Sequence, residues 1–228
     1  MVYKINFIYG IGIRCYTSII LKRLNLHPFS SIFGSLYIKN FNNLIKCFNT
    51  KFDILFNKNN LIFTKNYQKW INENNKYGNR TINKVFDNIN DYHSSTIPHH
   101  DLSLKKDLKH FERGIKRLEY IKKIKKLILF INISHSSEFN NSIYNINLLN
   151  SIKKYGFENF FIICIYKNEN IKEDKPLIIV NNYYIYEIKS FGYNDPRDDL
   201  KIHNLIKQKF NINLISKNII DNEIKFSN

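Results

Sequence analysis

Cysteine, acidic residues and long apolar runs are all scarce in this chain, and each shortage excludes a class of protein. The 228 residues include only three cysteines, Cys15, Cys47 and Cys164, which are too few and too scattered for a disulfide framework or a zinc site. No apolar run approaches the roughly 18 residues of a membrane-spanning helix, and the first strand-like segment lacks the cleavage site of a signal peptide. We therefore expect a cytoplasmic protein in a reducing compartment.

The shortage of acidic residues leaves the chain strongly basic. Nineteen Asp and Glu residues stand against 35 Lys and Arg residues, which gives a formal charge of +16. Such a charge attracts polyanions non-specifically, so nucleic acid is a candidate partner. However, the chain is rich in Asn, Ile, Lys, Tyr and Phe, the residues that an AT-rich genome supplies in excess. Lysines of that origin spread over the surface without forming a groove, and we do not favour a nucleic-acid function.

What is present predicts one folded domain. Hydrophobic residues make up 43% of the chain, which excludes an intrinsically disordered protein. Continuous apolar runs at 127–133 and 159–166 are typical of buried strands, and the helical spacing at 143–155 between them predicts a parallel strand–helix–strand unit. With a first strand at 5–9 and a long helix at 104–121, the chain is predicted to be a single α/β domain. Its mixed, mostly parallel sheet is flanked by helices in three layers.

The remaining elements are predicted from local signals. Residues 177–181 and 183–188 are predicted to form an antiparallel hairpin at the sheet edge. Asp198 or Asp199 is predicted to cap a last helix that runs through Phe210.

Two other regions have weaker patterns. Residues 52–56 and 61–67 are predicted to be extended or irregular. Residues 72–90 are polar and rich in asparagine, and we expect an irregular insertion at the surface.

The most informative stretch lies near the start of the chain, where an apolar strand leads through Gly10 and Gly12 to Cys15 and a helix. Unpaired N–H groups and the positive end of a helix dipole favour a thiolate, so Cys15 is a candidate nucleophile. The alternative is a small buried hydrophobic side chain. The two glycines also suggest a turn that holds phosphate, although a dinucleotide-binding fingerprint would have a third glycine where Cys15 stands.

A second polar landmark, His99, His100 and Asp101, directly precedes the long predicted helix. A histidine close to Cys15 could act as its general base or as the cationic half of an ion pair. Loops at the carboxyl ends of parallel strands meet at one edge of a sheet, and the loop with His135 is expected at the same edge. Alternatively, Asp101 caps the helix and both histidines are structural. A metal site at these three residues has no second ligand cluster to support it, and we expect no cofactor.

The long helix also carries candidate anion ligands. Arg113 and Arg117 lie one turn apart and could together bind a phosphate or a carboxylate, although a basic helix face is usually only solvated. His27, His110 and His203 lie in or beside predicted helices and are expected at the surface.

Three motifs occur in the order found in a known family. The first is Gly-Ile-Arg-Cys at 12–15, followed by Leu-Lys-Arg at 21–23. The second, at 30–35, keeps Ser and Phe of a Ser-x-Pro-Phe-Asp-Trp-like segment but has Gly34 in place of Asp. The third is His-His-Asp at 99–101, before the arginine-bearing helix and the strand at 127–133. Up to about residue 161, the chain resembles the putative papain-like cysteine peptidases, a family of bacterial and large-virus proteins.

The resemblance implies that Cys15 is the nucleophile, that His99 or His100 is its partner, and that the substrate is a peptide or a small acyl compound. Backbone N–H groups near Cys15 would stabilise the oxyanion. A papain-like fold would pair a helical half with an antiparallel half-barrel, whereas the strand pattern favours a parallel sheet.

Two other functions stay open. One is a phosphosugar- or nucleotide-dependent transferase on a doubly wound sheet, in which Arg113 and Arg117 bind phosphate and Cys15 is structural. The other is a non-catalytic basic binding module. The predicted substrate- or anion-binding residues are Gly10, Gly12, Ser31, Arg113 and Arg117. No pattern in the sequence indicates an oligomeric state.

Overall fold

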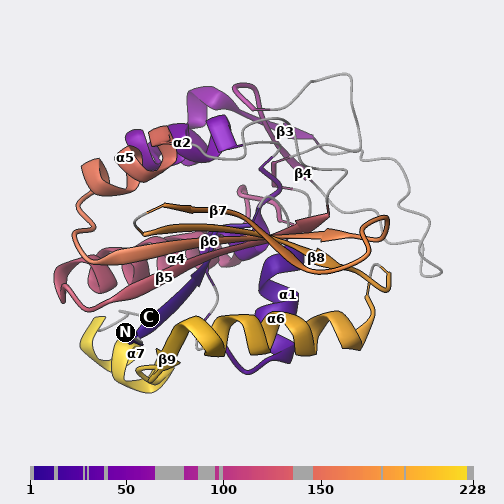
Figure 1. Ribbon diagram of the computed structural model, residues 1–228. Coiled ribbons are helices and arrows are strands. Elements are labelled where there is room, and N and C mark those ends of the chain that lie inside the picture. Colours follow the sequence, from indigo (N-terminus) through magenta and orange to yellow (C-terminus); the bar gives the residue numbers. More distant parts are fainter. Residues whose placement is uncertain are drawn as a thin grey trace.

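The protein is described by a computed structural model whose main feature is a five-stranded sheet (Figure 1). The structure describes residues 3–12, 15–27, 29, 31–38, 41–64, 80–86, 96–97, 100–135, 146–180, 182–192 and 194–224. The strand order is β2-β5-β6-β8-β7. These strands are β2 (Phe7–Gly10), β5 (Ile128–His135), β6 (Phe160–Asn168), β7 (Lys175–Val180) and β8 (Tyr183–Lys189). Strands β2, β5, β6 and β8 are parallel, and β7 pairs antiparallel with β8 at the edge.

The sheet confirms the predicted α/β fold with a mixed, mostly parallel sheet. Strands β5 and β6 are buried along almost their whole length, as expected for parallel strands covered on both faces. The predicted edge hairpin is the β7–β8 pair. Because this sheet is not an antiparallel half-barrel, the strand pattern was the better guide to the fold than the papain comparison.

Helices cover both faces of the sheet, which makes three layers (Figure 1). The helices are α1 (Tyr16–Arg23), α2 (Phe41–Asn49), α3 (Asp53–Phe56), α4 (Lys105–Lys123), α5 (Ile146–Tyr155), α6 (Pro196–Lys209) and α7 (Lys217–Ile224). Alternate strand residues face opposite sides, so the sheet contributes to two hydrophobic clusters. Phe130 and Ile162 pack with α2, α4 and α5, whereas Ile131 and Ile163 pack with α1 and α6.

Short elements complete the fold at its margins. Strand β1 (Tyr3–Ile5) pairs parallel with β9 (Phe210–Ile212), so segments near opposite ends of the chain lie side by side. Strands β3 (Leu61–Thr64) and β4 (Arg80–Asn83) form an antiparallel pair. Two 3₁₀ helices, η1 (Ile32–Ser35) and η2 (Lys58–Asn60), lie in the connections.

Several local predictions need correction. Residues 53–56 form helix α3 and not an extended segment. Within the predicted insertion at 72–90, residues 80–83 form strand β4, and most of the rest lies outside the described residues. The cap of α6 is Asp195, whose carboxylate accepts the Arg197 N–H, and neither Asp198 nor Asp199. The sequence supports this cap, because Pro196 follows it and proline favours the first helical position.

No helix in the described part of the chain is long and apolar enough to cross a membrane.

Candidate active site

Cys15 lies between the carboxyl end of β2 and the amino end of α1, as predicted. It is the N-cap residue of α1, where the Ile19 N–H donates to its carbonyl oxygen at 3.0 Å. Its side chain is half-buried and forms no capping hydrogen bond. The first turn of α1 contains no acidic residue, so no local carboxylate competes for its N–H groups. Position and exposure therefore suit a thiol that meets a substrate.

The other two cysteines do not suit this role. Cys47 in α2 and Cys164 in β6 are both fully buried. Burial raises the pKa of the Cys47 thiol to about 12 and that of the Cys164 thiol to about 11. Both thiols are therefore protonated at neutral pH and out of reach of a substrate, whereas a nucleophile must be an accessible thiolate.

His100 lies just before α4 in a cluster of rings. Its ring stacks on that of His110, with centroids 5.0 Å apart and planes 14° apart, and meets the Phe111 ring edge-on at 5.2 Å. Its Nδ1 lies 3.4 Å from Oδ1 of Asp107, in the first turn of α4. The other oxygen of Asp107 accepts the backbone N–H of Asp101 at 2.8 Å. Asp107 therefore orients both the His100 ring and the loop that carries it.

Asp107 is a residue that the sequence reasoning missed. The available signal in the sequence is a carboxylate in the first turn of a helix that follows two histidines. Asp101, the alternative cap, does not cap α4: its Oδ1 accepts from the N–H and the hydroxyl of Ser103, and the N-cap position is Leu104. His99 lies outside the described residues.

His110 is not a surface residue, contrary to expectation. It is half-buried in α4, and its Nε2 lies 2.9 Å from the Ser35 hydroxyl of η1. Burial lowers the pKa of His110, and the nearby His100 and Arg113 lower it further. Burial thus disfavours the charged form of His110, and His100 is the histidine with a carboxylate beside its ring.

The 3₁₀ helix η1 packs against both α1, which follows Cys15, and α4, which contains His110. A Cβ atom at Gly34 would lie 2.6 Å from the Ser18 hydroxyl of α1, and one at Gly114 of α4 would lie 3.2 Å from the backbone of Ile32. Gly34 therefore lets η1 pack closely against α1, and Gly114 lets α4 pack closely against η1. From β2, the Tyr9 hydroxyl accepts the Ile32 N–H at 3.0 Å.

Ser31, one of the predicted substrate-binding residues, is buried at the start of η1. Its hydroxyl accepts the Gly34 N–H at 3.0 Å and so caps η1. This contact explains the serine structurally, and its contact with a substrate stays a prediction.

His135 lies close to the first residue of α1. It ends β5, next to β2 in the sheet, and its ring centroid is 5.4 Å from that of Tyr16, the residue after Cys15. Among the described side chains, the Cys15 thiol forms no hydrogen bond with a histidine, so its pairing with His99 or His100 stays a prediction.

Arg117, one half of the predicted anion site, is buried and already bound. Its guanidinium makes two hydrogen bonds of 2.9 Å to the carboxylate of Asp221 in α7 and lies over the Phe29 ring. Arg113 is half-buried on the same helix. A phosphate held by both arginines would compete with Asp221, and this role also stays a prediction.

The two glycines before Cys15 are buried. A Cβ atom at Gly10 would lie 3.3 Å from the Thr17 side chain and 3.4 Å from that of Leu21. Gly10 thus lets α1 pack closely on β2, which is a structural reason for the glycine. Phosphate binding by Gly10 and Gly12 stays a prediction.

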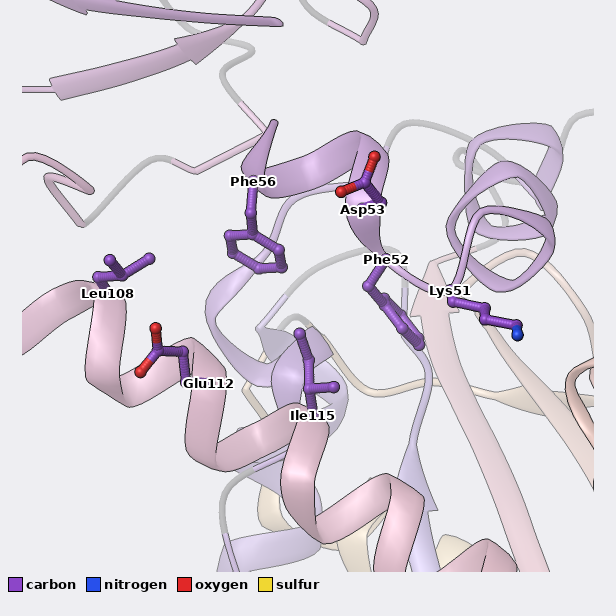
Figure 2. Close-up of a pocket in the computed structure, with 7 residues that line it drawn as sticks. All are labelled: Lys51, Phe52, Asp53, Phe56, Leu108, Glu112 and Ile115. Atoms are coloured by element: carbon purple, nitrogen blue, oxygen red, sulfur yellow. The ribbon is translucent and has the colours of Figure 1, made fainter. Parts of the chain in front are cut away.

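A surface cavity of about 290 Å³ lies apart from these residues, between α3 and α4. Figure 2 shows Phe56 extending from α3 toward Leu108 and Ile115 of α4. The lining residues are Lys51, Phe52, Asp53, Phe56, Leu108, Glu112 and Ile115. None of the predicted site residues is among them. Residues two apart on a helix face nearly opposite directions, so His110 lies on a different face of α4 from Leu108.

Among the described residues, no three metal-ligating side chains form a cluster.

Comparisons with known proteins indicate a family of cysteine peptidases. Curated proteins gave no match, and solved structures gave none either. A family model described as "Putative papain-like cysteine peptidase" matches residues 7–170. The matched region covers more than half of the chain and includes Cys15, His100 and Asp107. The chain therefore belongs to the putative papain-like cysteine peptidase family.

Proposed function

We propose that this protein is a cysteine hydrolase that cleaves an amide bond, with Cys15 as nucleophile and His100 as its acid–base partner. The observation that carries the proposal is the contrast among the three cysteines. Cys15 is partly exposed at a helix N-terminus, whereas Cys47 and Cys164 are fully buried thiols with raised pKa values. Family membership supports the same reaction class.

In this proposal, each step of the reaction is assigned to a group of this chain. The Cys15 sulfur adds to the acyl carbon, and the N–H groups of the first turn of α1 face the developing oxyanion. His100 takes the thiol proton and gives it to the departing amine as the C–N bond breaks, which leaves a thioester. Water, deprotonated by His100, then hydrolyses the thioester and restores the thiol. Asp107 keeps the His100 ring oriented, 3.4 Å from its Nδ1. His99 is the alternative partner.

The first test measures which cysteine reacts. The native protein is treated with a limiting amount of iodoacetamide, and alkylation of each cysteine is followed by peptide mass spectrometry. We expect Cys15 to react at least about 100-fold faster than the buried thiols, because alkylation requires an accessible thiolate. Cys15→Ala should abolish this labelling, and the matched variant Cys47→Ala should leave it unchanged. Equal labelling of Cys47 or Cys164 would contradict the proposal.

The second test separates the histidine from the thiol. Hydrolysis of a fluorogenic peptide library is measured for His100→Gln and for the control His203→Gln, whose histidine lies in α6. We expect the first variant to lose about 10²- to 10⁴-fold in kcat, the usual contribution of a general acid–base group, and the control to retain wild-type activity. Full activity of His100→Gln would point to His99, and His99→Gln then becomes the deciding variant.

A phosphate-dependent transferase is the second candidate, and the parallel sheet favours it, since ligands bind outside the carboxyl ends of parallel strands. It predicts that nucleotide sugars or polyphosphates raise the melting temperature and that Arg113→Ala removes this effect. Arg113 suits the test better than Arg117, whose loss would also break the contact with Asp221.

A further inference from the structure

A fully buried ion pair lies beneath the first turn of α1. Lys167 of β6 and Asp198 of α6 have no exposed side-chain surface, and the lysine Nζ is 2.7 Å from Oδ2 of Asp198. Buried charges are costly unless hydrogen bonds complete their surroundings. Here Asp198 also accepts from the Ser190 hydroxyl at 2.7 Å and from the Phe191 N–H at 3.1 Å. The pair is thus built into a well-bonded polar network.

The same lysine contacts the residue next to the thiol. Its Nζ donates to the Tyr16 hydroxyl at 2.6 Å and to the Gly192 carbonyl at 2.9 Å. Tyr16 is the first residue of α1 and directly follows Cys15. The network therefore runs from Asp198 through Lys167 to the start of the helix that presents the nucleophile.

Thr17 attaches the first turn at a second point. Its hydroxyl donates to the Ile133 carbonyl at 3.0 Å and accepts the Ile133 N–H at 2.9 Å. The first turn of α1 is therefore bonded through side chains to both β5 and β6.

These contacts matter because α1 has little of its own to hold its N-terminus in place. The helix has eight residues, its N-cap side chain makes no capping hydrogen bond, and its first turn contains no acidic residue. A helix this short is marginal without tertiary contacts. The orientation of its first N–H groups thus depends on the side chains of Tyr16 and Thr17.

We propose that Lys167, held by Asp198, is a positioning residue for Cys15. Through the Tyr16 hydroxyl it fixes the first turn of α1, and so the thiol and the N–H groups that would receive the oxyanion. The inference rests on the proposed role of Cys15 as nucleophile.

Tyr16→Phe is the sharpest test, because it removes the hydroxyl that accepts from Lys167 and keeps the aromatic ring and the ion pair. Lys167→Met leaves an unpaired buried carboxylate and can fail to fold. The readout is the rate of Cys15 alkylation by iodoacetamide as a function of pH, resolved by peptide mass spectrometry. We expect the rate at neutral pH to fall about tenfold, which corresponds to the loss of one hydrogen bond from a charged donor. The midpoint of the rate–pH profile should move to higher pH, because the sulfur loses its alignment with the helix N-terminus.

The matched control breaks a different polar contact of α1, at its other end. Arg23, in the last turn of α1, lies 2.8 Å from Asp199 of α6. Asp199→Asn therefore loosens α1 from α6 at the end away from Cys15. We expect its alkylation profile to match the wild type. Melting temperatures of both variants establish that they are folded.

The outcomes separate this inference from the proposed function. A wild-type profile for Tyr16→Phe, or an equal loss for Asp199→Asn, overturns the positioning role. Hydrolysis by Cys15→Ala overturns the proposed function without touching the alkylation result. If Tyr16→Phe alone slows alkylation and shifts the profile, the positioning role is supported.

Discussion

The two helical layers of this protein are stabilised by different interactions. The α1–α6 layer combines apolar packing with two ion pairs, Lys167–Asp198 and Arg23–Asp199. In the opposite layer, aromatic rings pack around Phe48 of α2, with centroids 5.5–6.2 Å away. These rings belong to Phe33, Phe52, Phe130 and Tyr155. The thiol belongs to the ion-paired layer and His100 to the aromatic layer, so the proposed reaction depends on both.

The difference concerns buried charge: a fully buried ion pair stabilises the α1–α6 layer, whereas the ring contacts around Phe48 involve no charged group. Edge-to-face ring packing does not change with protonation, whereas a buried ion pair depends on both charges being present. The predictions below test this contrast, in order of decreasing expected effect.

Phe48→Ala should cost about 3–5 kcal/mol of unfolding free energy, because it opens a cavity among packed rings. Urea denaturation measures the change, and we expect the same loss at low and high salt. Phe63→Ala in β3 is the matched control, because Phe63 is 45% exposed; its loss should stay within about 0.5 kcal/mol, as for most surface substitutions. Equal losses for both variants would contradict the description of the aromatic layer.

Lys167→Met should cost about 3–5 kcal/mol, because it leaves Asp198 charged and buried without its partner. The double variant Lys167→Met/Asp198→Asn should recover most of this loss, since no buried charge remains. The measurement is a double-mutant cycle by urea denaturation. If the double variant were as unstable as the sum of the single variants, the pair would not be coupled.

The pH dependence of stability should report on His110, the half-buried histidine of α4. The pKa of His110 is lowered in the folded protein from 6.5, first by burial and then by His100 and Arg113. Below about pH 6.5 the unfolded chain binds more protons than the folded one, so stability falls as the pH falls. We expect His110→Gln to flatten this decline between pH 7.5 and 5.5. His203→Gln, which removes a less buried histidine, should flatten it less, and the reverse order would contradict the assignment.

The parts of the fold that follow from local pattern could be predicted from the sequence. The run at 127–133 is apolar except for Asn132, as expected for a strand covered on both faces, and Cys15 follows a strand and two glycines. These signals depend only on neighbouring residues, and they placed the sheet and the thiol correctly.

The long-range contacts could not be predicted. Lys167 lies near the end of an apolar strand, where a lysine is usually exposed to solvent, yet it is buried and its partner lies in a later helix. Asp198 was predicted to be a cap because an acidic residue near a helix start is most often one, and its burial against Lys167 overrides that local preference. Likewise, the contact of Asp107 with His100 requires the loop before α4 to turn back on the helix, which no spacing in the sequence specifies.

The close contact between Gly34 and Ser18 has a consequence for how this sequence can vary. Since a Cβ atom at position 34 would lie 2.6 Å from the Ser18 hydroxyl, a longer residue there requires a smaller one at position 18 or a shift of η1 away from α1. A shift would change the separation between the helix with Cys15 and the helix next to His100. Relatives that keep this separation should therefore show paired substitutions at positions 18 and 34, so that a larger side chain at one position accompanies a smaller one at the other.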